Sequence, residues 1–246
     1  MLQGTERALR VIEVVSELQP IGVGELSRLL GVPKSTMQRT LQTLADADWI
    51  ASDGGPYTRW RLTTRALRIG RRAASSDTFR SVALAEMARI RDAIDVTVTL
   101  QVRDGFNRMV LAARVDPDQP VSTSAEIGSS TPMSVTSGGI AYLAALGDEE
   151  VEAILADPLE KITDATVTDP EVIWRNVHAA RTAGFAVNLG QNREGVRAVA
   201  AVVLDTLGRP AAAIGISVPE FRFDQAVIED LGALVRCAAA AVSIVS

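Results

Sequence analysis

The sequence has little of what disulfides, metal clusters and membrane spans require. Its single cysteine, Cys237, can form neither an intramolecular disulfide nor a thiolate cluster, and the apolar helical pattern around it predicts a buried, inert thiol. The longest apolar runs, 198–204 and 237–242, are far shorter than the roughly 20 residues that cross a bilayer. The N-terminal segment carries no secretory signal pattern. We therefore expect a cytoplasmic protein with no membrane association, no metal and no other cofactor.

Motifs that carry catalytic chemistry are also missing. The single histidine, His178, falls inside a predicted helix, where a solvent-exposed side chain is the simpler interpretation. The chain contains no Gly-x-Ser-x-Gly elbow, no Walker motif and no Gly-x-Gly-x-x-Gly after a strand. We predict that the protein is not an enzyme. The alternative is a metabolic enzyme whose helical N-terminus serves only for oligomerisation.

The length and the distribution of charge indicate two domains with different surroundings. A chain of 246 residues exceeds the usual size of one domain. Residues 1–75 hold 11 basic and 7 acidic side chains, a net charge of +4, whereas residues 76–246 hold 14 and 23, a net charge of −9. This asymmetry predicts that the first part meets a polyanion, although a solvated charged surface is the alternative.

The first third predicts a winged helix-turn-helix. Apolar residues at helical spacing predict helices over 6–18, 25–30 and 34–45. Two short strands, 49–52 and 57–62, flank the turn residues 53–56 and predict a hairpin. A further helix over 65–74 is expected to link this domain to the next.

The third of these helices has the composition of a helix that enters the major groove of a DNA duplex. Short polar and basic side chains gather at its start, and two arginines alternate with apolar residues along the wing. A helical cap with Ser35 as an ordinary N-cap is the alternative. The predicted contacts with double-stranded DNA are Lys34, Ser35, Thr36, Gln38, Arg39, Arg59 and Arg61.

The remaining two thirds predicts an α+β domain. Helices are expected over 77–94, 137–146, from 148, over 169–183 and from 224, and strands over 96–102, 108–115, 121–127, 185–188, 196–205 and 210–218. Residues 128–135 are expected to form a loop. Strands that arrive as hairpins, with helices between groups of them, favour an antiparallel sheet covered by helices.

Nearly the whole chain resembles the IclR family of bacterial transcriptional regulators. The resemblance rests on Arg7-Ala8-Leu9, Gly31–Thr36 and Trp60-Arg61-Leu62 in the first part, and on Pro132–Gly139, Thr168-Asp169-Pro170, Gly184–Val187, Glu194–Ala201 and Gly215–Val218 in the second. It implies a DNA-binding domain over 1–63, a linker helix over 64–77 and an effector-binding domain over 78–246 with a GAF-like, six-stranded antiparallel sheet. It also implies homodimers, or dimers of dimers, that bind palindromic operators and respond to a small metabolite. A sensor domain that no longer binds DNA is a further alternative.

The resemblance also implies where an effector binds. The loop and helix start at 130–139 provide one side, and the N–H groups of Ser137, Gly138 and Gly139 are expected to be unpaired there. Strand residues provide the other side, although ordinary sheet core is the alternative for them. The family often has an acidic residue in place of Asn188 and a cysteine in place of Ala198, so we expect a less charged and roomier pocket; an organic acid is one candidate ligand. The predicted effector contacts are Met133, Ser134, Thr136, Ser137, Gly138, Asn188, Ala198 and Ser217.

Overall fold

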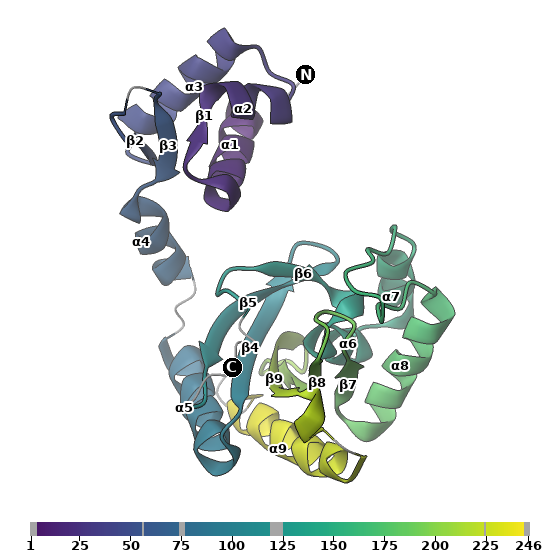
Figure 1. The fold of residues 1–246 in the computed structure, drawn as a ribbon. Coiled ribbons are helices and arrows are strands. Elements are labelled where there is room, and N and C mark those ends of the chain that lie inside the picture. The colour runs from purple at the N-terminus through teal and green to yellow at the C-terminus, as the bar shows by residue number, and fades with distance from the viewer. Residues whose placement is uncertain (1–3, 56, 74–76, 119–124, 224, 244–246) are drawn as a thin grey trace. The chain divides into compact units, whose positions relative to one another are not determined.

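The computed structural model describes residues 4–55, 57–73, 77–118, 125–223 and 225–243, and it divides the chain after residue 75 into two compact units (Figure 1). The linker helix α4 (Thr64–Ala73) belongs to the first unit. Within the described ranges, no helix combines the length and the apolar character that a bilayer span requires.

The first unit is a winged helix domain, as predicted. It consists of α1 (Gly4–Leu18), β1 (Ile21–Gly22), α2 (Val23–Leu29), α3 (Lys34–Asp46), β2 (Ile50–Ser52) and β3 (Arg59–Leu62), followed by α4. The strands form a small antiparallel sheet in the order β1-β3-β2. Strand β1 was not predicted from the sequence. It forms because Ile21 pairs with Trp60 across the sheet, which the local sequence does not reveal.

One apolar cluster fixes the angles among α1, α2 and α3. Val11 of α1, Leu26 of α2 and Leu41 of α3 are completely buried against one another, together with Trp60 of the wing. Truncating a buried leucine of this kind to alanine costs about 2–5 kcal/mol. The turn between α2 and α3 depends on Gly31, whose φ of +61° is a conformation that side chains with a Cβ rarely adopt.

The second unit is built on one antiparallel sheet. Within the residues that the structure describes, this sheet has six strands in the order β6-β5-β4-β9-β8-β7. The strands are β4 (Thr97–Asp104), β5 (Arg108–Val115), β6 (Ser130–Pro132), β7 (Ala186–Leu189), β8 (Val196–Leu204) and β9 (Pro210–Pro219). The helices are α5 (Asp77–Ile94), α6 (Ser137–Ala144), α7 (Asp148–Leu155), α8 (Pro170–Ala183) and α9 (Gln225–Ser243). The predicted α+β class is confirmed.

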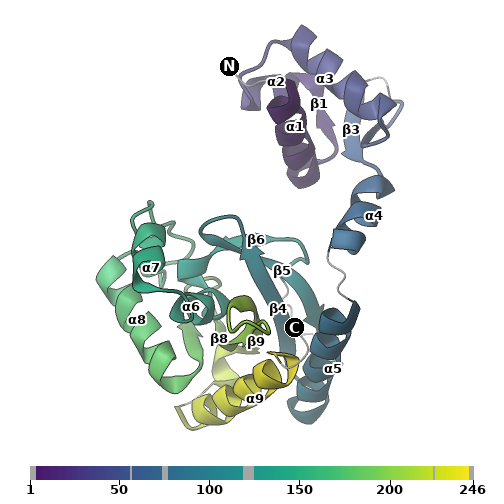
Figure 2. The ribbon, with the colours of Figure 1, turned by 180° about the vertical axis from the view of Figure 1, so that it is seen from behind.

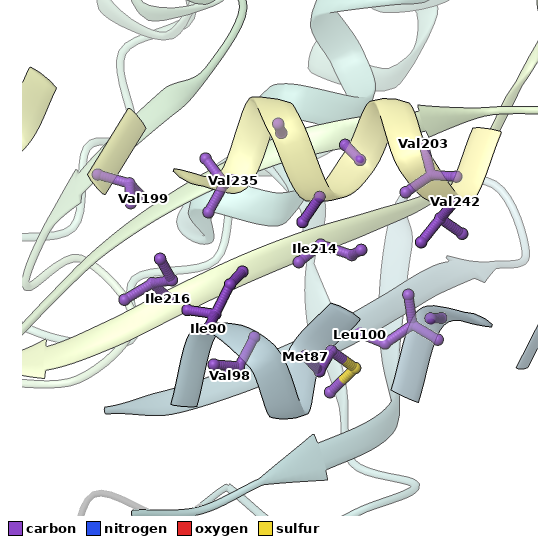
Figure 3. Packing of buried hydrophobic residues seen from close by; sticks show 14 of the residues in the cluster. Met87, Ile90, Val98, Leu100, Val199, Val203, Ile214, Ile216, Val235 and Val242 are labelled. Carbon is purple, nitrogen blue, oxygen red and sulfur yellow. The ribbon is translucent and has the colours of Figure 1, made fainter. Parts of the chain in front are cut away.

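Helices cover both faces of this sheet, as Figures 1 and 2 show. Helices α5 and α9 cover one face, where Figure 3 shows Met87, Ile90 and Val235 packed against strand residues such as Ile214. Helices α6, α7 and α8 pack on part of the opposite face, over a second apolar cluster. The rest of that opposite face carries polar side chains, and the candidate effector site lies there.

Three predictions about this unit were wrong. Residues 125–127 are not a strand, and residues 119–124 lie outside the described ranges; the strand that pairs with β5 is β6, inside the predicted loop. Strand β6 has no apolar alternation of its own. Its place at the sheet edge is set by pairing with Arg108–Val110, which the local sequence does not show. The thiol of Cys237 is exposed rather than buried, because it lies on the face of α9 that turns away from Val235 and Ala238.

Candidate functional site

The start of α3 presents polar side chains and open backbone donors. Lys34 is its first residue, and Pro33 occupies the N-cap position without a side-chain cap, so Ser35 is not an N-cap. The first backbone hydrogen bond of the helix runs from the N–H of Met37 to the carbonyl of Pro33. The N–H groups at 34–36 therefore precede the first intrahelical bond and are free to meet an anion such as a phosphate.

The predicted recognition side chains share one exposed face of α3. Lys34, Ser35, Gln38 and Arg39 are exposed and Thr36 is half-buried, whereas the opposite face is buried in the core of the unit. This arrangement leaves the polar face available for a partner.

A side chain that was not among the predicted contacts orients α3. The guanidinium Nε of Arg7, on α1, donates to the Thr40 hydroxyl at 3.0 Å, and this hydroxyl donates in turn to the carbonyl of Thr36 at 3.1 Å. The bond joins two helices that are 33 residues apart in sequence, which is why local patterns did not reveal it.

The two predicted wing arginines have different surroundings. Both are exposed, but Arg59 donates from Nη1 to the carbonyl of Pro20 at 2.9 Å and so ties the wing to β1. The tip of the wing is held by Asp53, which accepts from the backbone N–H of Arg59 at 3.1 Å. This backbone hydrogen bond is the main cause that lowers the pKa of the Asp53 carboxyl, and nearby Arg61 acts in the same direction.

A shallow groove between α2 and the wing adds residues that the sequence analysis missed. Arg28, on the exposed face of α2, and Tyr57, whose side chain is 85% exposed, line this groove beside Lys34 and Arg59. The position of Arg28 opposite Leu26 on α2 was a usable signal for an exposed cation.

The second unit contains a cavity on the polar part of its sheet. The volume inside it that the centre of a water molecule can reach is about 80 Å³. One row of side chains across four strands forms part of its wall: Thr97 of β4, Ser217 of β9, Ala198 of β8 and Asn188 of β7. The start of α6 closes one side with Thr136 and Ser137.

The structure separates the eight predicted effector residues into two groups. Those in the cavity wall are Thr136, Ser137, Asn188, Ala198 and Ser217. The other three are outside it: Met133 is completely buried, Ser134 faces a smaller hollow beside Ile154, and Gly138 packs against the side chain of Gln101.

Hydrogen bonds around α6 modify the prediction of three unpaired N–H groups at its start. The N–H of Gly139 donates to the Thr136 hydroxyl at 2.9 Å, so this donor is capped. The expectation was wrong for Gly139, because the cap residue Thr136 already satisfies it. The groups of Ser137 and Gly138 have no hydrogen bond within the described part of the chain.

The side chain of Asn188 holds two loops together. Its amide Nδ2 donates to the carbonyl of Val135 at 2.7 Å, and its Oδ1 accepts from the N–H groups of Gly190 and Gln191 at 3.1 Å each. It is 6% exposed. Asn188 therefore positions the segment that enters α6 relative to the loop that follows β7.

The cavity wall also contains polar residues that were not predicted. Thr97, Thr99 and Gln101 alternate along β4 with Val98 and Leu100, which lie on the opposite face in the core. This period-two pattern indicated a strand but not which face would be open. The other unpredicted residues are Leu111, Arg114, Ala125, Ser129, Thr131, Asn192, Arg193 and Val196.

The positive charge of the cavity wall comes from two arginines. Arg114 is an ion-pair partner of Asp116, with Nε 2.9 Å from Oδ2, and it also donates to the carbonyl of Ala125. Arg193 forms no ion pair or side-chain hydrogen bond in the part of the chain that the structure describes. Across these same described residues, no group of three or more His, Cys, Asp or Glu side chains is placed to hold a metal ion.

A winged helix domain followed by a helix-covered antiparallel sheet with a polar cavity is the architecture of a transcriptional regulator. Family models bear this out: the IclR helix-turn-helix domain matches residues 4–54, and the bacterial transcriptional regulator IclR C-terminal domain matches residues 71–244. The chain belongs to the IclR family of bacterial transcriptional regulators. It is accordingly a regulator with a DNA-binding type of domain and not an enzyme.

Curated relatives and solved structures are similar over almost the whole chain. The HTH-type transcriptional repressor AllR of Klebsiella pneumoniae is 30% identical over 239 residues, which cover 95% of this chain and 87% of the relative. The acetate operon repressor of Salmonella typhimurium is 26% identical over 246 residues, covering 99% and 89%.

Two solved structures share the fold. A regulator from Alicyclobacillus acidocaldarius, 24% identical, has a TM-score of 0.86 with coverage of 98% and 97%. An IclR homologue from Microbacterium hydrocarbonoxydans, solved with 4-hydroxybenzoate and also 24% identical, has a TM-score of 0.83 and covers 98% of each chain.

Proposed function

We propose that this protein is a ligand-responsive transcriptional regulator that binds a palindromic operator as a homodimer or a dimer of dimers. The observation that carries the proposal is the start of α3, where exposed polar side chains and open N–H groups lie on a helix whose other face is buried. A helix of this kind fits the major groove of B-form DNA. The repressor names of the relatives support a role in transcription.

The proposed contacts divide by chemistry. Gln38 and Arg39 lie one turn into α3 and have side chains long enough to reach base edges. The backbone phosphates are left to the residues at the helix start and on the wing. These are Lys34, Ser35, Thr36, Arg59 and Arg61, with Arg28 and Tyr57 beside them.

The proposed effector site is the cavity of the second unit. Its wall residues Thr136, Ser137, Asn188, Ala198 and Ser217 surround the ligand, while Met133, Ser134 and Gly138 shape the segment behind them. An effector regulates only if its affinity differs between the conformation that binds DNA and the one that does not. The homologue from Microbacterium hydrocarbonoxydans, which was solved as a complex with 4-hydroxybenzoate, supports a small-molecule ligand.

The test is duplex binding by the intact protein. An operator selected from a random duplex library should be bound in preference to shuffled sequence, and the logarithm of the affinity should fall linearly with that of salt. A ligand that fills the cavity should change this affinity. Failure to select any sequence would refute the proposed operator binding and favour the alternative of a sensor without DNA-binding activity.

A further inference from the structure

The cavity wall consists mainly of hydroxyl and amide side chains. It contains no aromatic ring and no carboxylate among its described residues, and its apolar members are the small or aliphatic Leu111, Ala125, Val196 and Ala198. The hydroxyl and amide side chains in the wall are Thr97, Thr99, Gln101, Ser129, Thr131, Thr136, Ser137, Asn188, Asn192 and Ser217. Such a surface offers many hydrogen-bonding groups and little for a ring to stack upon.

Several of these groups have no internal partner. Ser137 is only 6% exposed, yet its hydroxyl makes no hydrogen bond within the residues described. The same is true of the side chains of Gln101 and Ser217 in the described ranges. These side chains reach open space in the cavity and the protein leaves them without hydrogen bonds, so they favour a ligand that supplies donors and acceptors of its own.

Within the described residues, the cavity wall also carries one uncompensated positive charge, on Arg193, which is exposed and lies among the lining residues. Asp116 already compensates the charge of Arg114, whereas no acidic side chain of the described ranges compensates that of Arg193. Arg193 lies on the loop between β7 and β8, and this loop is anchored at its start. The Thr163 hydroxyl donates to the carbonyl of Gly190 at 2.8 Å, and the Thr166 hydroxyl donates to that of Gln191 at 2.7 Å.

We propose that the effector of this chain is a hydroxylated aliphatic acid, and that Arg193 determines this specificity by pairing with the acid group. The inference rests on the proposed function of the cavity and names its ligand class. The ligand hydroxyls meet Ser137, Gln101 and Ser217. An aromatic acid fits poorly, because a ring would leave these polar groups without partners, and sites built to bond a hydroxyl strongly reject analogues that lack it.

The first experiment is isothermal titration calorimetry on the full-length protein. The probes are tartrate, ribonate, gluconate and galactarate, with the neutral polyols ribitol and sorbitol and with benzoate and 4-hydroxybenzoate as comparisons. At least one hydroxylated acid should bind, and its neutral polyol should bind at least about tenfold more weakly, the factor expected from one charge-assisted hydrogen bond. Binding of none of these acids, or tighter binding of an aromatic acid, overturns the proposal.

The second experiment assigns the charge. Arg193→Gln should weaken binding of the acid by about tenfold or more and leave binding of the polyol unchanged. Arg193→Lys should retain part of the affinity for the acid. Arg175→Gln is the matched control, because Arg175 is exposed on α8 and outside the cavity wall. Equal affinity of Arg193→Gln and the parent protein for the acid overturns the role of Arg193.

The outcome for the ligand class is separable from that for the proposed function. Calorimetry reports ligand binding without DNA, and operator binding is measured without ligand. If an aromatic acid binds and changes operator affinity, the proposed regulatory function is supported and the proposed ligand class is refuted. If a hydroxylated acid binds but no duplex sequence is selected, the proposed ligand class is supported and the proposed operator binding is refuted.

Discussion

The side-chain amide of Asn188 donates a 2.7 Å hydrogen bond to the backbone carbonyl of Val135, which lies 53 residues earlier in the sequence. The bond joins an edge strand to the segment that leads into α6. The resemblance alone suggested that Asn188 touches the effector. Its three bonds to the backbone give it a structural task within the cavity wall, where a ligand can still lie against it.

Asn188→Ala should destabilise the second unit. The substitution leaves the carbonyl of Val135 and two backbone N–H groups without their partner, and each unsatisfied buried group costs about 1–3 kcal/mol. Urea unfolding followed by circular dichroism measures the loss of free energy. Asn176→Ala is the matched control, since Asn176 lies half-exposed on α8. Equal midpoints for the two variants would contradict the structural role.

Arg39→Ala should relax base preference at the operator. We propose that its guanidinium reads a base edge; if it does so with two hydrogen bonds, its loss should cost about 1–3 kcal/mol of binding free energy at the contacted base. Fluorescence anisotropy with the selected duplex and with single-base variants measures both quantities. Arg175→Ala, in the second unit, controls for general loss of positive charge. Unchanged affinity together with unchanged base preference would remove Arg39 from the interface.

Gly139→Ala should disrupt the start of α6. A Cβ on Gly139 would lie 2.1 Å from the backbone carbonyl oxygen of Met133 and 2.5 Å from its Cα, so the backbone itself must move. We expect a loss of about 3 kcal/mol or more, at the upper end of overpacking costs. Thermal unfolding of the variant provides the measurement.

Two further glycines provide comparisons for Gly139. At Gly138 the neighbour is the Gln101 side chain, which can rotate away, so Gly138→Ala should be milder and should alter ligand binding. Gly147→Ala meets nothing within 4 Å and should change stability least. A milder effect at Gly139 than at Gly147 would show that the segment around Met133 is free to move.

Tyr142 should ionise above the ordinary tyrosine value of 10.0, because burial raises the pKa of its hydroxyl and outweighs the opposing effect of Arg103. The hydroxyl donates to the carbonyl of Pro210 at 2.8 Å. A neutral group whose pKa is raised by folding contributes stability below the unfolded pKa, and this contribution disappears as the pH rises through the folded pKa. The free energy of unfolding should therefore fall at alkaline pH.

Ultraviolet titration of the folded protein checks the Tyr142 prediction. The chain has two tyrosines, so the phenolate absorbance that develops above the ordinary range should be absent from Tyr142→Phe. The same variant should lose part of the alkaline decline in stability. A late absorbance that persists in Tyr142→Phe would refute the assignment.

The sequence predicted the elements that are determined by neighbouring residues, such as helix caps and turns. Helix α8 begins where expected, with the Asp169 side chain accepting from the N–H of Glu171 at 2.9 Å, and ends at Gly184 with a φ of +77°. The winged helix followed from helical spacing and turn residues in the same way. Strand β6 was missed because only its pairing with β5 defines it.

The cavity wall was predicted in part for the same physical reason. The segment at Thr136 and Ser137 was recognisable as a helix start, which is a local feature. Arg114 and Arg193 enter the wall from a strand and a loop that lie on opposite sides of β4 and β9 in the sheet order. Their meeting depends on the order and register of the strands, which a single sequence does not specify.

The alternation along β4 assigns core packing and ligand recognition to different residues. Val98 and Leu100 belong to the packed interior, while Thr97, Thr99 and Gln101 point to the opposite side of the same strand. Substitutions at Thr97, Thr99 and Gln101 can therefore change which metabolite binds without disturbing the packing of Val98 and Leu100. A library confined to these three positions should yield folded regulators with new chemical preferences.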